Sequence, residues 1–347
     1  MSEQQSPEYA KISNATAISL GLMQGRMYRE AVNRCVNLLV HYPEGCSANC
    51  AYCGLAKNRP GSYREKSFIH VAWPVFPMDE IIGAINQAPS YVKRACISMI
   101  TNGKCNRHTI DMSTRLNHET ALPVSVLINP TIVENADLMA MKEGGVDKIG
   151  VAIDLATQEL FEKYRGKGVS GPHRWERYWE VLNKGLKVFG KGNVGVHLMV
   201  GMGETEKQMV SLVDRLWGMG IVNHLFSFLA ENASRLTDRP QPPWSTYLRV
   251  QLARYLIENK LSKSQDMAFD TEGRITEFGL TRDRLQEVID WGSAFTTSGC
   301  LGSDGRVACN RPFGNCLPDV KQWNYPYPPN LEEIGLIRQN IFRIEEK

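Results

Sequence analysis

Cys46-Ser-Ala-Asn-Cys50-Ala-Tyr-Cys53 places three cysteines within eight residues, shortly after an apolar run at 36–40. An apolar run, a Pro-Glu-Gly turn and then three thiols describe a buried strand that leads into a loop. Neighbouring thiolates repel one another and oxidise easily, and soft sulfur ligands at this density select zinc or an iron–sulfur cluster. Structural zinc usually takes four ligands, often as two pairs. Three ligands therefore favour a [4Fe–4S] cluster with one iron open to another ligand.

The spacing C-x3-C-x2-C, with the aromatic Tyr52 before Cys53, resembles the signature of the radical S-adenosylmethionine (SAM) enzymes. The resemblance implies that Cys46, Cys50 and Cys53 hold a [4Fe–4S] cluster whose open iron chelates SAM. It also implies that electron transfer cleaves SAM to methionine and a 5'-deoxyadenosyl radical. A reductant such as ferredoxin or flavodoxin is then a required partner. Structural zinc and a redox disulfide are the alternative interpretations of the three thiols.

The composition is that of an ordinary globular protein. Of the 347 residues, 43% are hydrophobic and 22% are charged, and the net charge of +3 gives no reason to expect a nucleic acid partner. No apolar run approaches the roughly 18 residues that span a membrane, and the polar start at 1–11 lacks a signal sequence. We therefore expect a cytoplasmic protein with no membrane partner. In that compartment nine cysteines indicate metal or redox sites before disulfides.

Short apolar runs alternate with helical patterns along most of the chain. Strands are expected at 35–42, 94–101, 122–128, 147–153, 194–200, 222–229, 266–270 and 295–298. Helices are expected at 12–34, 78–88, 133–143, 156–164, 173–187, 206–218, 246–258 and 282–290. Such alternation predicts a parallel sheet covered by helices, and eight units suggest a closed (β/α)8 TIM-type barrel. The expected domains are an N-terminal helical cap (1–34), the barrel (35–299) and a cysteine-containing C-terminal extension (300–347).

A second group of cysteines, Cys300, Cys309 and Cys316, lies in a glycine-rich segment near the C-terminus. Glycines let the backbone approach a metal closely. We interpret the group as ligands of a second, auxiliary [4Fe–4S] cluster. The fourth ligand stays open between Ser298, Ser303 or Asp304, a neighbouring chain and a substrate. Structural zinc and incidental buried cysteines are the alternatives.

Three further cysteines are interpreted without a metal. Cys35 and Cys96 lie in apolar strands, where a buried thiol serves as a small hydrophobic group. Cys105 is expected in a polar loop.

Beyond the cysteines, the order of features resembles the biotin-synthase-like branch of radical SAM proteins over residues 35–300. The resemblance implies contacts with SAM at strand ends, where TIM barrels place their active sites. Asp154 then contacts the ribose and Arg174 the carboxylate. A capping role for Asp154 and an ordinary turn at 201–204 remain alternatives. The full set of residues implied to bind the cofactor is Tyr52, Asn102, Asp154, Arg174, Met199 and Gly201.

The sequence departs from biotin synthase, because the trio lacks a Pro-Glu-Asp segment and the second cysteine group is C-terminal. That arrangement resembles the lipoyl synthases in which two radical SAM subunits share the task. The implied activity is sulfur insertion into unactivated C–H bonds, from octanoyl to lipoyl, on an octanoylated carrier protein with a second radical SAM subunit. The alternatives are a biotin-synthase-like or cofactor-assembly enzyme whose second cluster is structural or relays electrons, and a non-enzymatic iron–sulfur carrier.

Overall fold

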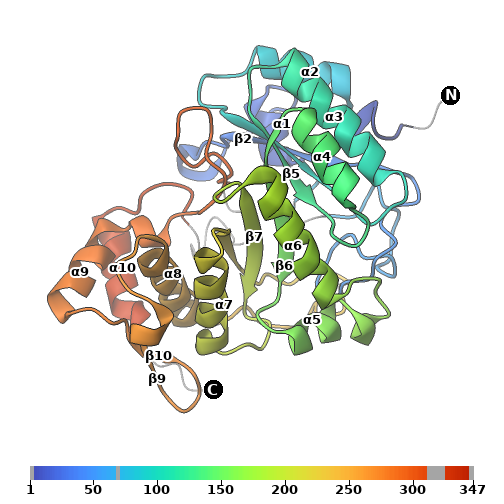
Figure 1. The fold of residues 1–347 in the computed structure, drawn as a ribbon. Helices are drawn as coiled ribbons and strands as arrows, with labels where there is room; N and C mark the ends of the chain where they lie inside the picture. Colours follow the sequence, from blue (N-terminus) through green and yellow to red (C-terminus); the bar gives the residue numbers. More distant parts are fainter. Residues whose placement is uncertain (1–3, 68–70, 311–324, 344–347) are drawn as a thin grey trace.

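The computed structural model describes residues 4–67, 71–310 and 325–343, and its centre is one eight-stranded sheet. The strand order is β3-β1-β2-β4-β5-β6-β7-β8, and helices cover the outer face (Figure 1). Six neighbouring strands are parallel: β2 (Cys35–Val40), β4 (Arg94–Ser98), β5 (Val124–Ile128), β6 (Val146–Asp154), β7 (Val194–Val200) and β8 (Val222–Ser227). Their valine, leucine and isoleucine side chains are buried, as parallel sheets require. The α/β class with a TIM-like parallel sheet is confirmed.

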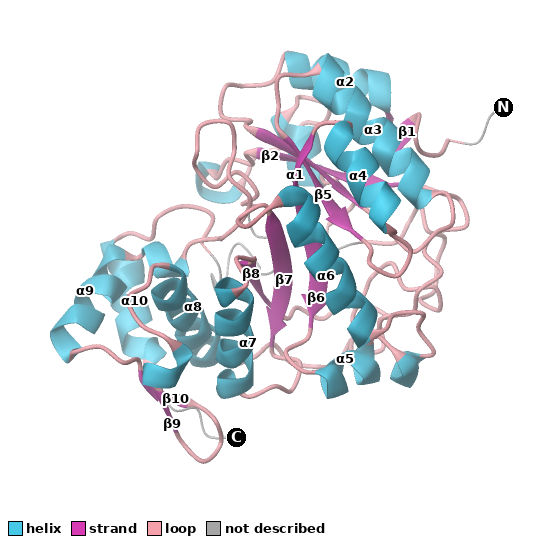
Figure 2. Cartoon of the chain, in the orientation of Figure 1, coloured by secondary structure: helices cyan, strands magenta, loops and turns pink. Residues whose placement is uncertain are grey.

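Each crossover between parallel strands carries at least one helix (Figures 1 and 2). The helices are α2 (Met78–Asn86), α3 (Cys105–Glu119), α4 (Asn135–Glu143), α5 (Gln158–Tyr164), α6 (Trp175–Phe189) and α7 (Glu206–Gly218). Local sequence sets their ends. Thr205, for example, forms a capping box with Gln208 at the start of α7.

The expected closed (β/α)8 barrel is wrong for the described residues, because β3 (Val75–Pro77) and β8 form two open edges of the sheet. The segment expected as strand 266–270 contains η3 (Ser264–Asp266) and β9 (Ala268–Phe269), which pairs only with β10 (Ile275–Glu277). The segment at 295–298 follows η4 (Ser293–Phe295) and makes single contacts with Tyr325. Both segments carry too few apolar residues for a buried strand of the barrel.

The expected N-terminal helical cap is also corrected. Residues Tyr9–Ile12 form β1, which pairs antiparallel with β2 through Ala10 and Val40 and so extends the main sheet. Only Asn14–Ser19 are α-helical (α1), followed by the single turn η1 (Tyr28–Glu30). The helix stops before Gly21, whose φ of 72° lies in the left-handed region, and several apolar residues after it are exposed.

The loop expected around Cys105 is wrong as well, because Cys105 is the first residue of α3 and is completely buried. Buried side chains recur along this helix at Cys105, Thr109, Met112 and Leu116. Their spacing of three to four residues is helical, but the polar residues between them conceal it.

A group of helices follows the sheet and packs beside α7 (Figure 2). Its members are α8 (Trp244–Glu258), α9 (Arg282–Trp291) and α10 (Leu331–Ile341). The buried pair of Glu206 and Arg249 joins α7 to α8, and Arg249 also donates to the carbonyl of Ile341 at 2.9 Å. This link fixes the helical group against the sheet.

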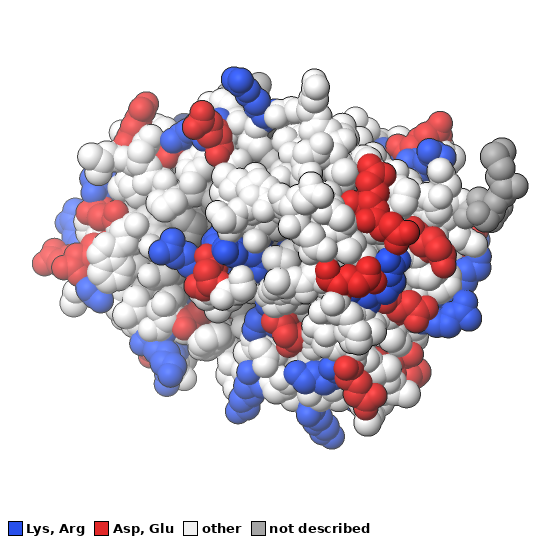
Figure 3. All heavy atoms as spheres, turned by 90° about the horizontal axis from the view of Figure 1, so that it is seen from above, with Lys and Arg blue, Asp and Glu red and all other residues white. Residues whose placement is uncertain are grey.

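The surface seen in Figure 3 carries lysines and arginines interspersed with acidic residues. This mixture agrees with the small net charge of +3. In the described part of the chain, no helix has the length and apolar character needed to cross a bilayer.

Candidate active site

The cysteine loop lies at the carboxyl end of β2, where neighbouring strand ends hold its backbone. The amide and the hydroxyl of Ser47 both donate to the carbonyl of Thr101, at 2.9 and 3.0 Å. The amide of Ala51 donates to the carbonyl of Tyr164 at 2.8 Å. These bonds aim the loop inward, and all three of its cysteines line a cavity of about 260 Å³ inside the sheet.

Tyr52 connects this loop to the end of β6. Its hydroxyl donates to the carboxylate of Asp154 at 2.6 Å and accepts from Arg165 at 2.8 Å, while Arg165 also forms an ion pair with Asp154. Asp154 has a left-handed backbone, with φ of 65°. A non-glycine residue in that region stores strain, which in many proteins accompanies a functional site. The three side chains form one buried polar cluster beside the thiols.

Burial governs the protonation of the groups around the trio. It raises the pKa of Cys50 to about 11, and the nearby Arg165 cation opposes the rise. Burial also raises the pKa of Cys53. A metal would compensate the cost of burying these thiolates, because coordination replaces the proton.

Arg165 continues the polar network on its other side. Its Nη2 donates to the hydroxyl of Tyr178 at 3.0 Å, and that hydroxyl lies 3.2 Å from Nδ1 of His173. Since Tyr178 accepts from a cation, its own proton is available to His173. Burial, with Arg165 and Arg174 nearby, lowers the pKa of His173 to about 2 and keeps its imidazole neutral.

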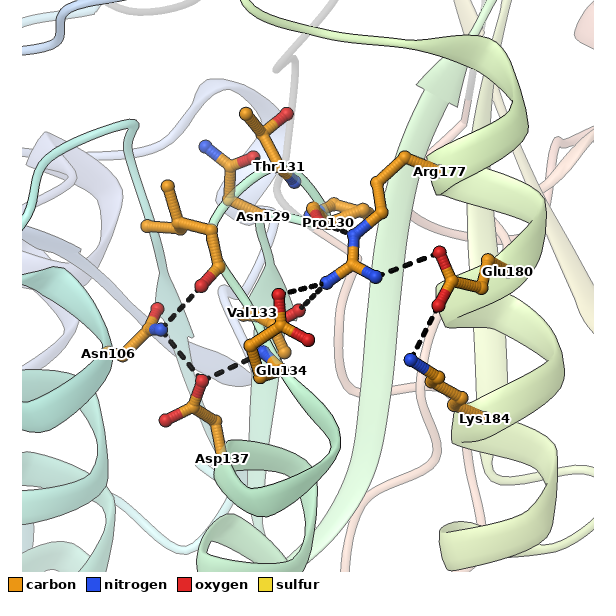
Figure 4. Close-up of polar contacts among 11 residues, drawn as sticks. Asn106, Asn129, Pro130, Thr131, Val133, Glu134, Asp137, Arg177, Glu180 and Lys184 are labelled. Atoms are coloured by element: carbon orange, nitrogen blue, oxygen red, sulfur yellow. Dashed lines mark hydrogen bonds and ion pairs between the residues drawn. The ribbon is translucent and has the colours of Figure 1, made fainter.

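The loop after β5 delivers two further side chains to this region, and Figure 4 shows how it is held. Arg177 of α6 donates to the carbonyls of Pro130 and Val133, at 3.1 and 2.6 Å, and Asn106 of α3 donates to that of Ile132 at 2.7 Å. The fixed loop places Asn129 in the cavity lining and the Thr131 hydroxyl 2.5 Å from His173.

The structure places some of the predicted SAM-binding residues in the cavity and others outside it. Tyr52, Asp154 and Met199 line the cavity with the three cysteines. Asn102 instead braces the loop, through a 3.2 Å bond from its amide group to the carbonyl of Gly45. Gly201 has φ of 108° and lies in a turn, where its amide donates to Glu204 at 2.7 Å.

The arginine singled out from the sequence lies outside the cavity. Arg174 is exposed and donates to the carbonyls of Gly171 and His173, at 2.9 and 2.8 Å. Arg165, which sequence reasoning missed, lines the cavity instead. It directly follows α5, so both arginines come after β6, and spacing alone does not separate them.

A second missed residue is Glu231, which lies beyond β8 and lines the cavity. It is buried and accepts from the Ser67 hydroxyl at 3.1 Å. Its carboxylate acts electrostatically on Cys53. Acidic groups at two strand ends, Asp154 and Glu231, therefore flank the trio. Only the position at a strand end signals such a residue.

The C-terminal cysteines approach the cavity from the opposite end to the one expected. Cys300 and Cys309 line the cavity, but their segment contacts the strand starts. The amide of Ser303 donates to the carbonyl of Lys93 at 3.1 Å, and Arg94 donates to that of Leu301 at 2.6 Å. The loop therefore does not emerge beside the Cys46 loop, as adjacency in a closed barrel implied. Cys316 lies outside the described residues.

The donor chemistry of the trio is that of an iron–sulfur site. Within the described ranges, no three His, Cys, Asp or Glu side chains surround one metal ion, and this includes Cys46, Cys50 and Cys53. The amide of Leu55 donates to the sulfur of Cys53 at 3.4 Å, and hydrogen bonds to ligand sulfurs are a usual feature of iron–sulfur sites.

Comparison with solved structures gives partial alignments at low identity. Methylornithine synthase (PylB) gives a TM-score of 0.49 at 12% identity, over 71% of this chain and 66% of its own. The [FeFe]-hydrogenase maturase HydG gives 0.49 at 12%, over 70% and 57%. The radical S-adenosylmethionine methyltransferase TsrM from Kitasatospora setae gives 0.42 at 11%, over 89% and 59%. The chain spans less than two thirds of the length of each of these three proteins.

Sequence comparison gives the family. No curated protein matches the chain significantly. The family description "Radical SAM superfamily" matches residues 40–216, just over half of the chain, and includes the cysteine trio, Asp154 and Arg165. The chain therefore belongs to the Radical SAM superfamily.

Proposed function

We propose that this radical SAM enzyme inserts sulfur into an unactivated C–H bond of an acyl substrate held in its cavity. One observation carries the proposal: the same cavity is lined by Cys46, Cys50 and Cys53 at one end and by Cys300 and Cys309 at the other. A substrate between the two ends has SAM on one side and a sulfur source on the other.

The residues beside the trio suit SAM. When bound, the [4Fe–4S] cluster supplies the electron that cleaves SAM to methionine and a 5'-deoxyadenosyl radical. Asp154 accepts hydrogen bonds and so offers a partner for ribose hydroxyls, and Arg165 offers a cation for the carboxylate of SAM. Tyr52 holds both of them through its hydroxyl. These assignments follow the chemistry of each side chain and its place next to the trio.

The middle of the cavity suits an alkyl chain. Its lining includes large apolar side chains, namely Leu39, Trp73, Met99, Leu127 and Phe226. Such a lining buries a hydrocarbon favourably and excludes the water that would compete for a radical. We therefore propose an octanoyl group as the substrate, presented by a carrier protein and converted to a lipoyl group, with a second radical SAM subunit as partner.

The proposed step balances in atoms and electrons. Each new C–S bond would consume one SAM, with the hydrogen atom leaving in 5'-deoxyadenosine. Cys300 and Cys309 would hold the auxiliary cluster, which would supply the sulfide for the carbon and take up the remaining electron. A reductant such as ferredoxin or flavodoxin supplies the electron that cleaves SAM.

The test is anaerobic incubation of an octanoylated carrier protein with the enzyme, SAM and dithionite, with and without a partner subunit, followed by mass spectrometry of the carrier. We expect a mass gain from sulfur, with 5'-deoxyadenosine formed in step. The double variant C300A/C309A should still form 5'-deoxyadenosine but add no sulfur. If wild type and variant modify the substrate equally without sulfur, the second site only relays electrons or stabilises the fold. Absence of methionine formation by the wild type would indicate an iron–sulfur carrier.

A further inference from the structure

Four cysteines from three distant parts of the chain meet at the strand-start end of the cavity. The sulfur of Cys309 lies 3.8 Å from that of Cys35, and Cys96 and Cys300 line the cavity together with Cys309. The distance between Cys309 and Cys35 exceeds the 2.05 Å of a disulfide, and both residues are free thiols.

The register of the sheet brings Cys35 and Cys96 to one side. Cys96 lies across from Asn37 in the parallel pair of β2 and β4, and both line the cavity. Cys35 is two residues before Asn37, so it shares the same face one layer deeper. Cys96 therefore lies in the cavity lining and Cys35 one layer beyond it, in contrast to the interpretation of both as hydrophobic filler.

The C-terminal segment is shaped to present its two cysteines together. The amides of Ala308 and Cys309 both donate to the carbonyl of Cys300, at 2.9 and 3.2 Å. A Cβ atom on Gly299 would meet the carbonyl oxygen of Cys309 at 2.1 Å, so this close return requires glycine. Local backbone geometry thus holds Cys300 and Cys309 in fixed positions relative to each other.

Contacts with the strand starts hold the segment over the two strand cysteines. Arg34, directly before Cys35, donates to the carbonyl of Val307 at 2.9 Å and pairs with Asp304. Asn310, directly after Cys309, accepts from the amide of Arg34 at 3.2 Å. The residue before Cys35 and the residue after Cys309 are therefore hydrogen-bonded to each other, which holds the two cysteines close together.

We propose that Cys35, Cys96, Cys300 and Cys309 together ligate the auxiliary iron–sulfur cluster, so that Cys35 and Cys96 complete its ligand set. This assignment of ligands deepens the proposed function. It rests on sulfur insertion only for what the cluster is used for, and the choice of ligands does not depend on it. In this assignment Cys35 and Cys96 take the place of Ser303 and Asp304, two candidates for the fourth ligand, which lie in the exposed tip of the segment. Ser298 lines the cavity, but its hydroxyl bonds the carbonyl of Asn223 at 3.5 Å.

The surroundings favour an iron–sulfur cluster over structural zinc. None of the four cysteines is paired with another at the short C-x2-4-C spacing of closed zinc sites. Three of them, Cys96, Cys300 and Cys309, face the cavity, as a cluster that meets a substrate must. The buried guanidinium of Arg94 and the ammonium of Lys148 lower the electrostatic cost of negative charge at Cys300.

The test isolates this site in a C46A/C50A/C53A background, which removes the SAM cluster. Anaerobically purified protein should then keep about four iron atoms and four sulfides per chain. Adding Cys35→Ala, Cys96→Ala, Cys300→Ala or Cys309→Ala should lower both contents by at least half and change the electron paramagnetic resonance of the reduced sample. The matched control is Cys105→Ala, a buried thiol whose sulfur lies 3.8 Å from the Thr109 hydroxyl and which lies outside the set. It should keep its iron.

Circular dichroism establishes that each variant is folded, and the serine replacements of the same cysteines repeat the test with less change in volume. Full iron in both the Cys35 and Cys96 variants would overturn the assignment. So would zinc in place of iron, or a Cys35–Cys309 disulfide in metal-free protein. If the wild type holds the cluster through these four residues but forms no C–S bond, the ligand set stands and sulfur insertion alone fails.

Discussion

The hydroxyl of Tyr52 donates a 2.6 Å hydrogen bond to the carboxylate of Asp154, and so joins the cysteine loop to the end of β6. Arg165 bonds both partners and is itself almost buried, with 11% of its side chain exposed. A buried cation and carboxylate that share a third polar group hold one another in fixed positions. The residue before the third cysteine of the motif is thus part of the polar wall of the cavity.

This wall predicts that Arg165 supports SAM binding and Arg174 does not. Arg165→Lys removes the planar fork that spans Asp154 and Tyr52, and should weaken SAM binding by about tenfold or more. Arg174→Ala removes only bonds to backbone carbonyls at the surface and should leave the affinity within about twofold. Equilibrium binding of SAM to the reconstituted enzyme measures both. Equal losses in the two variants would count against the assignment of Arg165.

Replacing all three cysteines of the trio by alanine should abolish cleavage of SAM, because no other thiol that the structure describes in the cavity lies beside Tyr52 and Asp154. The strands and helices should persist, since the loop backbone is held by Thr101 and Tyr164 rather than by the sulfurs. Production of 5'-deoxyadenosine and far-ultraviolet circular dichroism are the two measurements. Undiminished production of 5'-deoxyadenosine by the triple variant would contradict the assignment of the trio as cluster ligands.

Much of the fold was predictable because strong local signals coincide with the final elements. The apolar run at 194–200 is β7 to the residue, and the pattern at 206–218 is α7, with Thr205 as its cap. The segment at 295–298, Phe-Thr-Thr-Ser, failed because so short a stretch with a single apolar side chain carries no period that distinguishes a strand from a turn. The N-terminal segment failed because Gly21, with φ of 72°, stops the helix shortly after it begins.

The site shows the same division between local and non-local information. The trio is a local pattern, so its residues could be named from the sequence. The choice between Arg165 and Arg174 depends on where the chain turns after α5, which spacing does not encode. The meeting of Cys309 with Cys35 spans 274 residues, and only the return of the C-terminal segment to the strand starts brings it about.

Stability should fall in mild acid because His173 is buried in its neutral form. Its pKa is lowered to about 2, chiefly by burial, whereas an unfolded histidine titrates near 6.5. Below about pH 6.5 the unfolded chain therefore binds more protons, and each unit decrease of pH lowers the free energy of unfolding by about 1.4 kcal/mol from this residue. At pH 5 the loss is about 2 kcal/mol, and above pH 7 the contribution is complete.

Urea unfolding of the wild type and of two variants at pH 7 and pH 5 measures this effect. The quantity compared is the drop in the free energy of unfolding between the two pH values. His173→Gln should shrink the drop between the two pH values by about 2 kcal/mol. His118→Gln, at an exposed position in the last turn of α3, should leave it unchanged. An identical pH dependence in wild type and H173Q would exclude His173 as the source.

The buried pair of Glu206 and Arg249 should contribute more to stability than surface pairs do. The two side chains are 5% and 4% exposed, and Glu206 also accepts from the amide of Ile275 at 2.8 Å. Glu206→Gln leaves the buried guanidinium without its counter-charge and should cost about 3–5 kcal/mol in the free energy of unfolding. Glu287→Gln breaks the exposed pair with Arg284 and should cost less than about 1 kcal/mol. Similar costs in chemical denaturation would contradict this.

Arg177 should act on SAM cleavage from outside the cavity, by holding the loop after β5 (Figure 4). Its guanidinium bonds the carbonyls of Pro130 and Val133, and the loop positions Asn129 and Thr131 at the site. Arg177→Met keeps the length of the side chain but removes these bonds. Because displacement of a positioned group by about 1 Å can cost about 100-fold in rate, we expect 5'-deoxyadenosine formation to slow by at least tenfold.

Hydrogen exchange distinguishes this positioning role from general destabilisation. In the Arg177 variant the amides of residues 129–134 should exchange faster, while those of β7 on the far side of β6 stay protected. The control is Lys184→Met on the same helix, which removes only the outer contact with Glu180 at 2.5 Å. It should alter neither exchange nor rate. If R177M slows the reaction with no change in exchange at 129–134, the loop is not the route by which Arg177 acts. Faster exchange throughout the sheet would instead identify the effect as loss of stability.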